Sequence, residues 1–210
     1  MTALYHAMGT TAKGVIMAKT MKRDAVLNLT MGGLFTAIVI VLQMFASAVR
    51  FGPFQISLVL IPIVIGAAVC GWKVSTWLGF VFGLVVLLNG DATAFLTINA
   101  MGTVITVLLK GAACGLAAGL IYKALEQKNR YLAVILSAIA APVVNTGIFL
   151  AGCRLFFFET IKEWGAGAGF DNPVVYMIAG LVGINFLVEM ASNIVVSPVI
   201  LRIINAFRKR

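Results

Sequence analysis

Charged side chains are scarce in this 210-residue sequence, where they make up 11% of the residues while hydrophobic ones make up 61%. Soluble domains carry about a quarter charged residues, with which they cover their surfaces. The scarcity excludes an ordinary soluble domain, whereas a lipid bilayer accepts an apolar exterior. The sequence therefore predicts an all-α membrane protein, and its length leaves room for about five to seven spans of about 20 residues each.

Several chemistries lack the residues that they would need. The sequence has one histidine, and its three cysteines lack paired spacing, which gives no indication of a metal site or a disulfide framework. It contains no Gly-x-x-x-x-Gly-Lys-[Ser/Thr] loop, so the chain has no ATPase of its own, and it contains neither Gly-x-Ser-x-Gly nor His-Glu-x-x-His. We expect no enzymatic activity, no cofactor and no metal.

Apolar runs, separated by turn-forming or charged residues, predict a bundle of six transmembrane helices. The predicted helices cover residues 25–48, 55–70, 75–88, 103–125, 131–157 and 175–201. A semi-polar loop at 89–102 follows the third helix, and the longest loop, rich in glycine and charge, covers 159–174. The transmembrane domain is predicted at 25–205, between an N-terminal tail (1–24) and a basic C-terminal tail (206–210).

The basic residues are distributed unevenly along the chain. An even number of helices places both termini on one side, and that side then holds twelve of the sixteen Lys and Arg residues: Lys13, Lys19, Lys22, Arg23, Lys73, Lys123, Lys128, Arg130, Arg202, Arg208, Lys209 and Arg210. Because loops rich in Lys and Arg stay in the cytoplasm, both termini are predicted to be cytoplasmic. The net charge of +9 then reflects membrane topology, and we expect no nucleic-acid partner.

Polar side chains within the apolar runs are few, and each is costly at membrane depth. Asn185, Glu189 and Asn193 are spaced by four residues, which places them on one face of the sixth helix. Hydrogen bonding between helices explains the asparagines as well as ligand binding does. An intramembrane carboxylate such as Glu189 instead indicates a functional role.

Lys110 is the cation at depth in the fourth helix, about 10 Å from the predicted outer end. It shares a face with Thr103 and Thr106. Two interpretations are open: its ammonium snorkels to the interface, or it faces an outer cavity and binds a substrate carboxylate.

Three further residues complete the predicted substrate-binding set. Asn145 lies near mid-depth beside Pro142, which frees a backbone carbonyl one turn earlier. Arg154 lies near the outer end of the same helix, where it is either an interface anchor or a ligand-binding residue. Asn99 lies in the 89–102 loop, which we expect to dip into the bundle.

Small residues at a spacing of four predict flat strips for close helix packing. Gly111, Gly115 and Gly119 form such a strip on the fourth helix, and we expect it to pack within the bundle. A second strip, Gly33 and Ala37 on the first helix, is also available to an external partner.

Local patterns occur in an order that resembles the membrane-embedded S components of energy-coupling factor (ECF) vitamin transporters over roughly residues 25–205. The matching segments are Ile61-Pro62-Ile63-Val64-Ile65-Gly66, Gly71-Trp72-Lys73, Leu78-Gly79-Phe80-Val81-Phe82-Gly83-Leu84, Lys110-Gly111, Gly115-Leu116-Ala117-Ala118-Gly119-Leu120-Ile121-Tyr122-Lys123 and Ala141-Pro142-Val143-Val144-Asn145-Thr146. The resemblance implies a bacterial plasma-membrane protein that binds a vitamin near the outer face. It also implies docking on a membrane coupling subunit that two separate ATPase subunits power. Family members dock through an Ala-x-x-x-Ala motif, to which Gly33 and Ala37 correspond.

The resemblance leaves the substrate open. The segment Phe54-Gln55-Ile56-Ser57-Leu58 lacks the acidic residue that a riboflavin-binding member would carry, while Lys110 and Arg154 suit an anionic nutrient. Pantothenate is therefore the first expectation, and another nutrient such as riboflavin is the alternative. Two other classes remain open: a stand-alone secondary transporter with Glu189 as its coupling site, which would need a repeat or broken helices, and a membrane enzyme or scaffold subunit.

Overall fold

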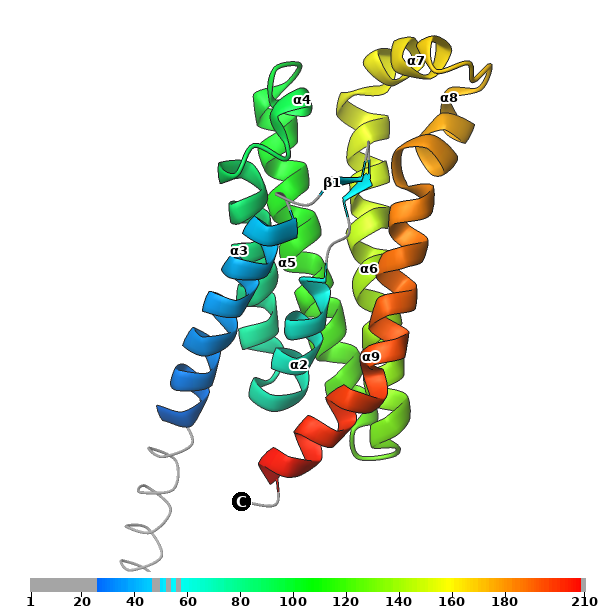
Figure 1. Cartoon of the computed structure of the whole chain (residues 1–210). Helices are drawn as coiled ribbons and strands as arrows, with labels where there is room; N and C mark the ends of the chain where they lie inside the picture. Colours follow the sequence, from blue (N-terminus) through cyan, green and yellow to red (C-terminus); the bar gives the residue numbers. More distant parts are fainter. Residues whose placement is uncertain (1–25, 47–49, 52–53, 56–57, 209–210) are drawn as a thin grey trace, which may run out of the picture.

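The computed structural model describes residues 26–46, 50–51, 54–55 and 58–208, which form a helical bundle (Figure 1). The predicted tail at 1–24, the turn at Gly52-Pro53 and the last two residues lie outside this part of the chain. Within these described ranges, four helices are long and apolar enough to cross a membrane. They are the N-terminal helix (Val26–Ala46), α5 (Ala100–Leu125), α6 (Arg130–Phe156) and the helix Pro173–Ile204.

Two shorter apolar helices, α2 (Leu60–Cys70) and α3 (Trp72–Leu88), lie between the first and the second of these long helices. They are joined at Gly71, which has a φ of 85°, a conformation that glycine adopts at little cost. The all-α class is confirmed for the described residues, apart from one antiparallel pair of two-residue strands, β1 (Arg50–Phe51) and β2 (Phe54–Gln55).

The predicted start of the second helix at residue 55 is wrong, because Gln55 lies in β2 and α2 begins at Leu60. Pro62 explains the late start. A proline is tolerated in the first turn of a helix, where its missing N–H has no intrahelical partner in any case.

Two predicted loops contain helices. The 89–102 loop includes the single turn α4 (Thr93–Leu96), and the 159–174 loop includes α7 (Phe158–Gly167). Helix α7 buries Ile161 and Gly165, four residues apart, and exposes its charged residues. Its apolar positions are too few for a span but sufficient for a short amphipathic helix.

The C-terminal helix is longer than the predicted 175–201. It comprises α8 (Pro173–Val175), the π-helix η1 (Tyr176–Gly183) and α9 (Ile184–Arg208). Pro173 follows Asn172, whose side chain accepts a hydrogen bond from the Val174 N–H, a regular helix start.

Glycines bring α3 and α5 into backbone contact. A Cβ at Gly79 would overlap the Gly111 carbonyl oxygen, and one at Gly115 would overlap the Ser75 carbonyl oxygen. The Ser75 hydroxyl donates to the Gly115 carbonyl at 2.8 Å. The predicted role of the α5 glycines in packing within the bundle is confirmed.

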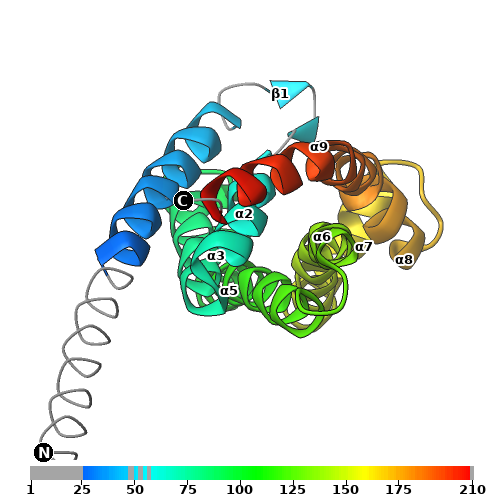
Figure 2. The ribbon, with the colours of Figure 1, turned by 90° about the horizontal axis from the view of Figure 1, so that it is seen from below.

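The N-terminal helix packs along one side of the bundle formed by α2, α3, α5, α6 and α9 (Figure 2). Its inner face buries Phe35, Val39 and Gln43. Gly33 and Ala37 are exposed on another face, and a Cβ at Gly33 would meet nothing within 4 Å. The predicted docking strip is therefore not used for packing within the described residues.

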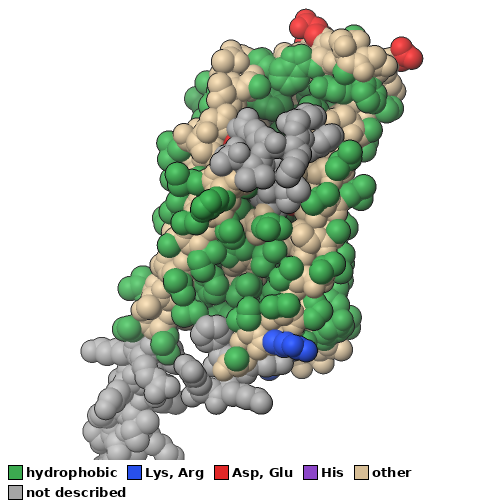
Figure 3. Space-filling view, viewed as in Figure 1, with side chains coloured by type: hydrophobic (Ala, Val, Ile, Leu, Met, Phe, Trp, Pro, Cys, Tyr) green, Lys and Arg blue, Asp and Glu red, His purple; other side chains and the backbone are tan. Residues whose placement is uncertain are grey.

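Hydrophobic side chains cover the side of the bundle, as expected for a surface in contact with lipid (Figure 3). Acidic residues lie at the α7 end and basic residues at the opposite end in this view. Lys162, on α7, forms an ion pair with Glu159 at 2.9 Å.

Candidate ligand-binding site

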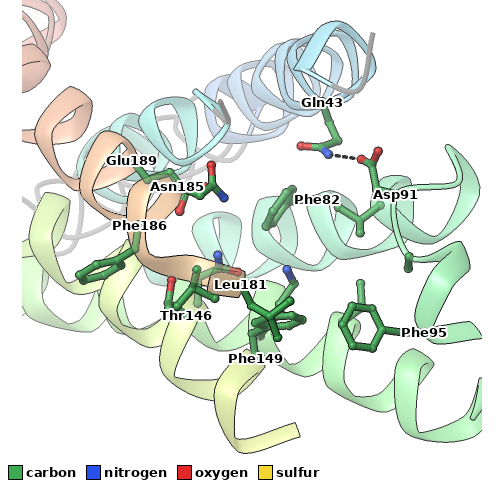
Figure 4. Close-up of a pocket in the computed structure, with 16 residues that line it drawn as sticks. Gln43, Phe82, Asp91, Phe95, Thr146, Phe149, Leu181, Asn185, Phe186 and Glu189 are labelled. Atoms are coloured by element: carbon green, nitrogen blue, oxygen red, sulfur yellow. Dashed lines mark hydrogen bonds between the residues drawn. The ribbon is translucent and has the colours of Figure 1, made fainter. Parts of the chain in front are cut away.

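A cavity of about 290 Å³ lies inside the bundle, toward the end that carries α4 and α7 (Figure 4). Its walls come from the N-terminal helix, α3, the turn before α4, and helices α4, α5, α6, η1 and α9. The lining residues are Gln43, Phe82, Val86, Asp91, Ala92, Phe95, Val107, Lys110, Asn145, Thr146, Phe149, Leu181, Val182, Asn185, Phe186 and Glu189. Its size suits a small metabolite, since ligand pockets measure about 300–1,000 Å³.

Lys110 supplies the positive charge of the cavity wall. Its ammonium lies 5.7 Å from the ring centroid of Phe82 and 5.3 Å from that of Phe149, within the range of a cation–π contact. Within the described residues it forms no ion pair. Its charge is thus held between two aromatic faces and is not neutralised by an internal carboxylate within ion-pair distance.

Carboxamide and carboxylate groups line the side of the cavity formed by α6 and α9. Glu189 is 4% exposed and Asn145 is 7% exposed. The Oδ1 atoms of Asn145 and Asn185 are buried, and neither accepts a hydrogen bond in the described part of the chain. Buried polar atoms without hydrogen-bond partners are costly. A ligand that donates hydrogen bonds to these two oxygens would remove that cost.

Asn193, the third residue of the predicted polar stripe, lies one turn beyond Glu189 and does not line the cavity. It is buried, and Ser197 donates to its backbone carbonyl at 2.8 Å. The stripe thus extends beyond the cavity toward the C-terminal end of α9.

The π-helix η1 forms the wall next to these residues through Leu181 and Val182. A π-helix has wider turns than an α-helix and occurs often at functional sites. Tyr176 packs against Gly180, where an added Cβ would lie 2.5 Å from the ring. A glycine at this position therefore makes room for the first residue of η1.

Aromatic rings close the cavity beneath α7. Phe95 makes edge contacts with Phe149, Phe157 and Trp164, at centroid distances of 5.6, 5.0 and 5.5 Å. Trp164 belongs to α7, and Phe95 and Phe149 line the cavity. Helix α7 is thereby packed onto the pocket residues through one aromatic cluster.

The last wall is polar. The Gln43 side-chain amide donates to the Asp91 carboxylate at 2.8 Å, and both residues line the cavity (Figure 4). This bond joins the N-terminal helix to the turn that precedes α4.

Four of the six predicted substrate-binding residues line this cavity: Lys110, Asn145, Asn185 and Glu189. The other two lie elsewhere. Asn99 caps α5 by accepting a hydrogen bond from the Gly102 N–H at 2.9 Å, which is a structural use of the side chain. Arg154 is exposed and stacks on Phe158 at 3.8 Å.

Sequence reasoning missed Gln43, Asp91 and the aromatic residues of the wall. Gln43 carried a usable signal, since it is a polar residue four positions after Val39 on the face that also holds Phe35. Asp91 falls in the predicted 89–102 loop, where a charged residue needs no special explanation. Phenylalanines in a membrane protein do not distinguish a pocket from lipid contact.

A family model described as the substrate-specific component of ECF transporters matches residues 27–201. The chain belongs to this family. The resemblance predicted from sequence is thereby confirmed, and the chain is a component of a transporter and not an enzyme.

One relative is the pantothenic acid transporter PanT of Lactococcus lactis subsp. cremoris (strain MG1363). It is 25% identical over 202 residues, which cover 86% of this chain and 94% of the relative. No solved structure matches the chain. Family and relative together support a role in vitamin uptake.

Proposed function

We propose that this S component binds pantothenate in the cavity that Lys110 lines. The observation that carries the proposal is a lysine ammonium at membrane depth with no internal ion pair among the described residues. Such a charge is costly in a bilayer, and a ligand carboxylate would compensate it. The similarity to a pantothenic acid transporter supports the same choice.

The remaining polar groups suit the rest of this ligand. Pantothenate carries hydroxyl groups and an amide besides its carboxylate. The Glu189 carboxylate and the side-chain oxygens of Asn145 and Asn185 are acceptors for O–H and N–H donors. The aromatic walls would cover its methyl and methylene groups. An anionic ligand with donor groups opposite its carboxylate therefore complements the cavity better than a flat neutral one.

In the proposed topology the chain crosses the bacterial plasma membrane six times, with both termini in the cytoplasm. The N-terminal helix, α5, α6 and Pro173–Ile204 supply four crossings, and α2 and α3 supply the other two. Exposed basic residues at the end opposite α7, such as Lys73 and Lys123, support this orientation. The cavity then lies toward the outer face, where the nutrient arrives.

The proposed partners are a membrane coupling subunit and two ATPase subunits, which the chain would engage through Gly33 and Ala37. The exposure of both residues and the open space around Gly33 support close approach by another helix. Membership of the family favours this arrangement over a stand-alone secondary transporter.

Identification of the native ligand tests the proposal. The purified protein is denatured, and the released small molecules are identified by mass spectrometry. Binding of pantothenate and riboflavin to ligand-free protein is then compared by calorimetry. We expect pantothenate to be released and to bind with high affinity. Release of riboflavin, or pantothenate binding no tighter than riboflavin binding, would refute the assignment.

A further inference from the structure

We infer that Gln43 is a positioning residue of the pocket: its hydrogen bond to Asp91 holds the N-terminal helix and the turn before α4 together, so that the ligand stays enclosed. The inference deepens the proposed function and rests on it in one respect, namely that the cavity is the ligand site. It concerns two residues that no sequence motif singles out.

The position of Gln43 on its helix shows that packing alone does not explain it. The inner face otherwise buries apolar side chains, including Phe35, Val39 and Ala46. Gln43 is 2% exposed on that face, where an unpaired amide would be costly. A leucine would fill the same space without that cost, whereas the amide nitrogen of Gln43 donates to Asp91.

The partner is held in place by its own turn. Gly90 has a φ of 87°, and the Asn89 side chain accepts a hydrogen bond from the Asp91 N–H at 3.1 Å. Thr93 in α4 donates to the Gly90 carbonyl at 2.7 Å. This compact turn fixes the direction of the Asp91 carboxylate, which accepts from Gln43 at 2.8 Å.

The bond connects parts of the molecule that are separate in the sequence. Gln43 and Asp91 are 48 residues apart. Phe95, which packs against α6 and α7, belongs to α4, the helix that follows Asp91. Gly33 and Ala37 lie on the same N-terminal helix as Gln43. The N-terminal helix therefore carries both the residue that helps to enclose the ligand and the strip, Gly33 and Ala37, that is proposed to contact a partner.

A double-mutant cycle tests this role. Gln43→Leu fills the same space but removes the amide donor and adds no charge to the pocket, so we expect pantothenate to dissociate about tenfold faster, the effect of losing one charge-assisted hydrogen bond. Asp91→Ala removes the acceptor of the same bond, so we expect the double variant Gln43→Leu/Asp91→Ala to dissociate no faster than the faster of the two single variants. Thr30→Ala, which removes a hydroxyl bonded within its own helix, is the matched control and should keep the wild-type rate.

Ligand-free hydrogen–deuterium exchange of residues 92–97 provides a second readout. We expect about tenfold faster exchange in Gln43→Leu and no further increase in the double variant, since the same bond holds α4. Wild-type exchange in Gln43→Leu, or effects of the two substitutions that add in full in the double variant, would overturn the inference. If wild-type protein fails to bind pantothenate, the proposed function fails, and the exchange data still decide whether Gln43 positions the pocket wall.

Discussion

Replacing Lys110 with methionine should weaken the binding of pantothenate and leave its uncharged alcohol analogue, panthenol, almost unaffected. Methionine keeps an unbranched chain of similar length, so Phe82 and Phe149 retain an apolar neighbour. The two ligands differ only at the group that we place beside the ammonium. The comparison therefore isolates the charge.

The structure sets the magnitude of this effect. A hydrogen bond to a charged group contributes about 1.5–3 kcal/mol. Lys110 forms no ion pair within the described residues, so ligand binding breaks no such pair, and the upper part of that range applies. A loss of about 2–3 kcal/mol corresponds to about 30- to 150-fold weaker binding of pantothenate.

The assay is calorimetric titration of purified wild-type protein and Lys110→Met with both ligands. Arg154→Met is the matched control, because this second basic residue is exposed and stacks on Phe158 outside the cavity, and we expect it to bind both ligands like wild type. The reasoning is refuted if Lys110→Met loses panthenol as strongly as pantothenate, or if it retains pantothenate within about twofold, a difference of less than about 0.5 kcal/mol.

Three more predictions follow from described contacts. Gly33→Leu should leave ligand affinity and thermal stability unchanged, because the space around Gly33 is open. It should reduce transport by the complete reconstituted complex by about fivefold or more, since overpacking at the docking contact costs about 1–3 kcal/mol. Normal transport would exclude this strip as the docking site. Gly79→Ala should destabilise the protein in detergent by about 1–3 kcal/mol, since the new methyl overlaps the Gly111 carbonyl. Gly147→Ala is the control and should not destabilise it, because a Cβ at Gly147 would meet nothing within 4 Å. Equal melting temperatures of the two variants would contradict the close packing. Glu189→Gln should weaken pantothenate binding by about 2- to 10-fold through loss of an acceptor, as measured by calorimetry, and unchanged affinity would place the ligand away from α9.

Features that depend on helix periodicity, or on the cost of placing a polar group in the bilayer, were predictable from the sequence. Long apolar runs marked α5 and α6 to within a few residues, because lipid permits few polar groups in a span. The same cost pointed to Lys110 and Glu189, which the structure brings to one cavity. Their partners across the cavity were not predictable, since a sequence does not show which helix faces which.

Other features depended on short-range or long-range contacts that spacing does not reveal. Helix α7 has Phe158, Ile161 and Trp164 at helical spacing, but this short period lies in a segment where glycines and charges favour a loop. The hydrogen bond by which Asn99 caps α5 depends on where that helix begins, and the predicted start at residue 103 does not reveal it. The Gln43–Asp91 hydrogen bond joins residues 48 positions apart, and no local sequence pattern predicts it.

The glycine contact between α3 and α5 also bears on how the pocket opens. Where the two backbones touch, at Gly79 and Gly111, no side chain lies between the helices that could change rotamer and absorb a shift. This pair should therefore behave as one rigid body during the transport cycle. The displacement that admits a nutrient then falls to the opposite walls, where larger side chains separate the N-terminal helix and α9 from their neighbours.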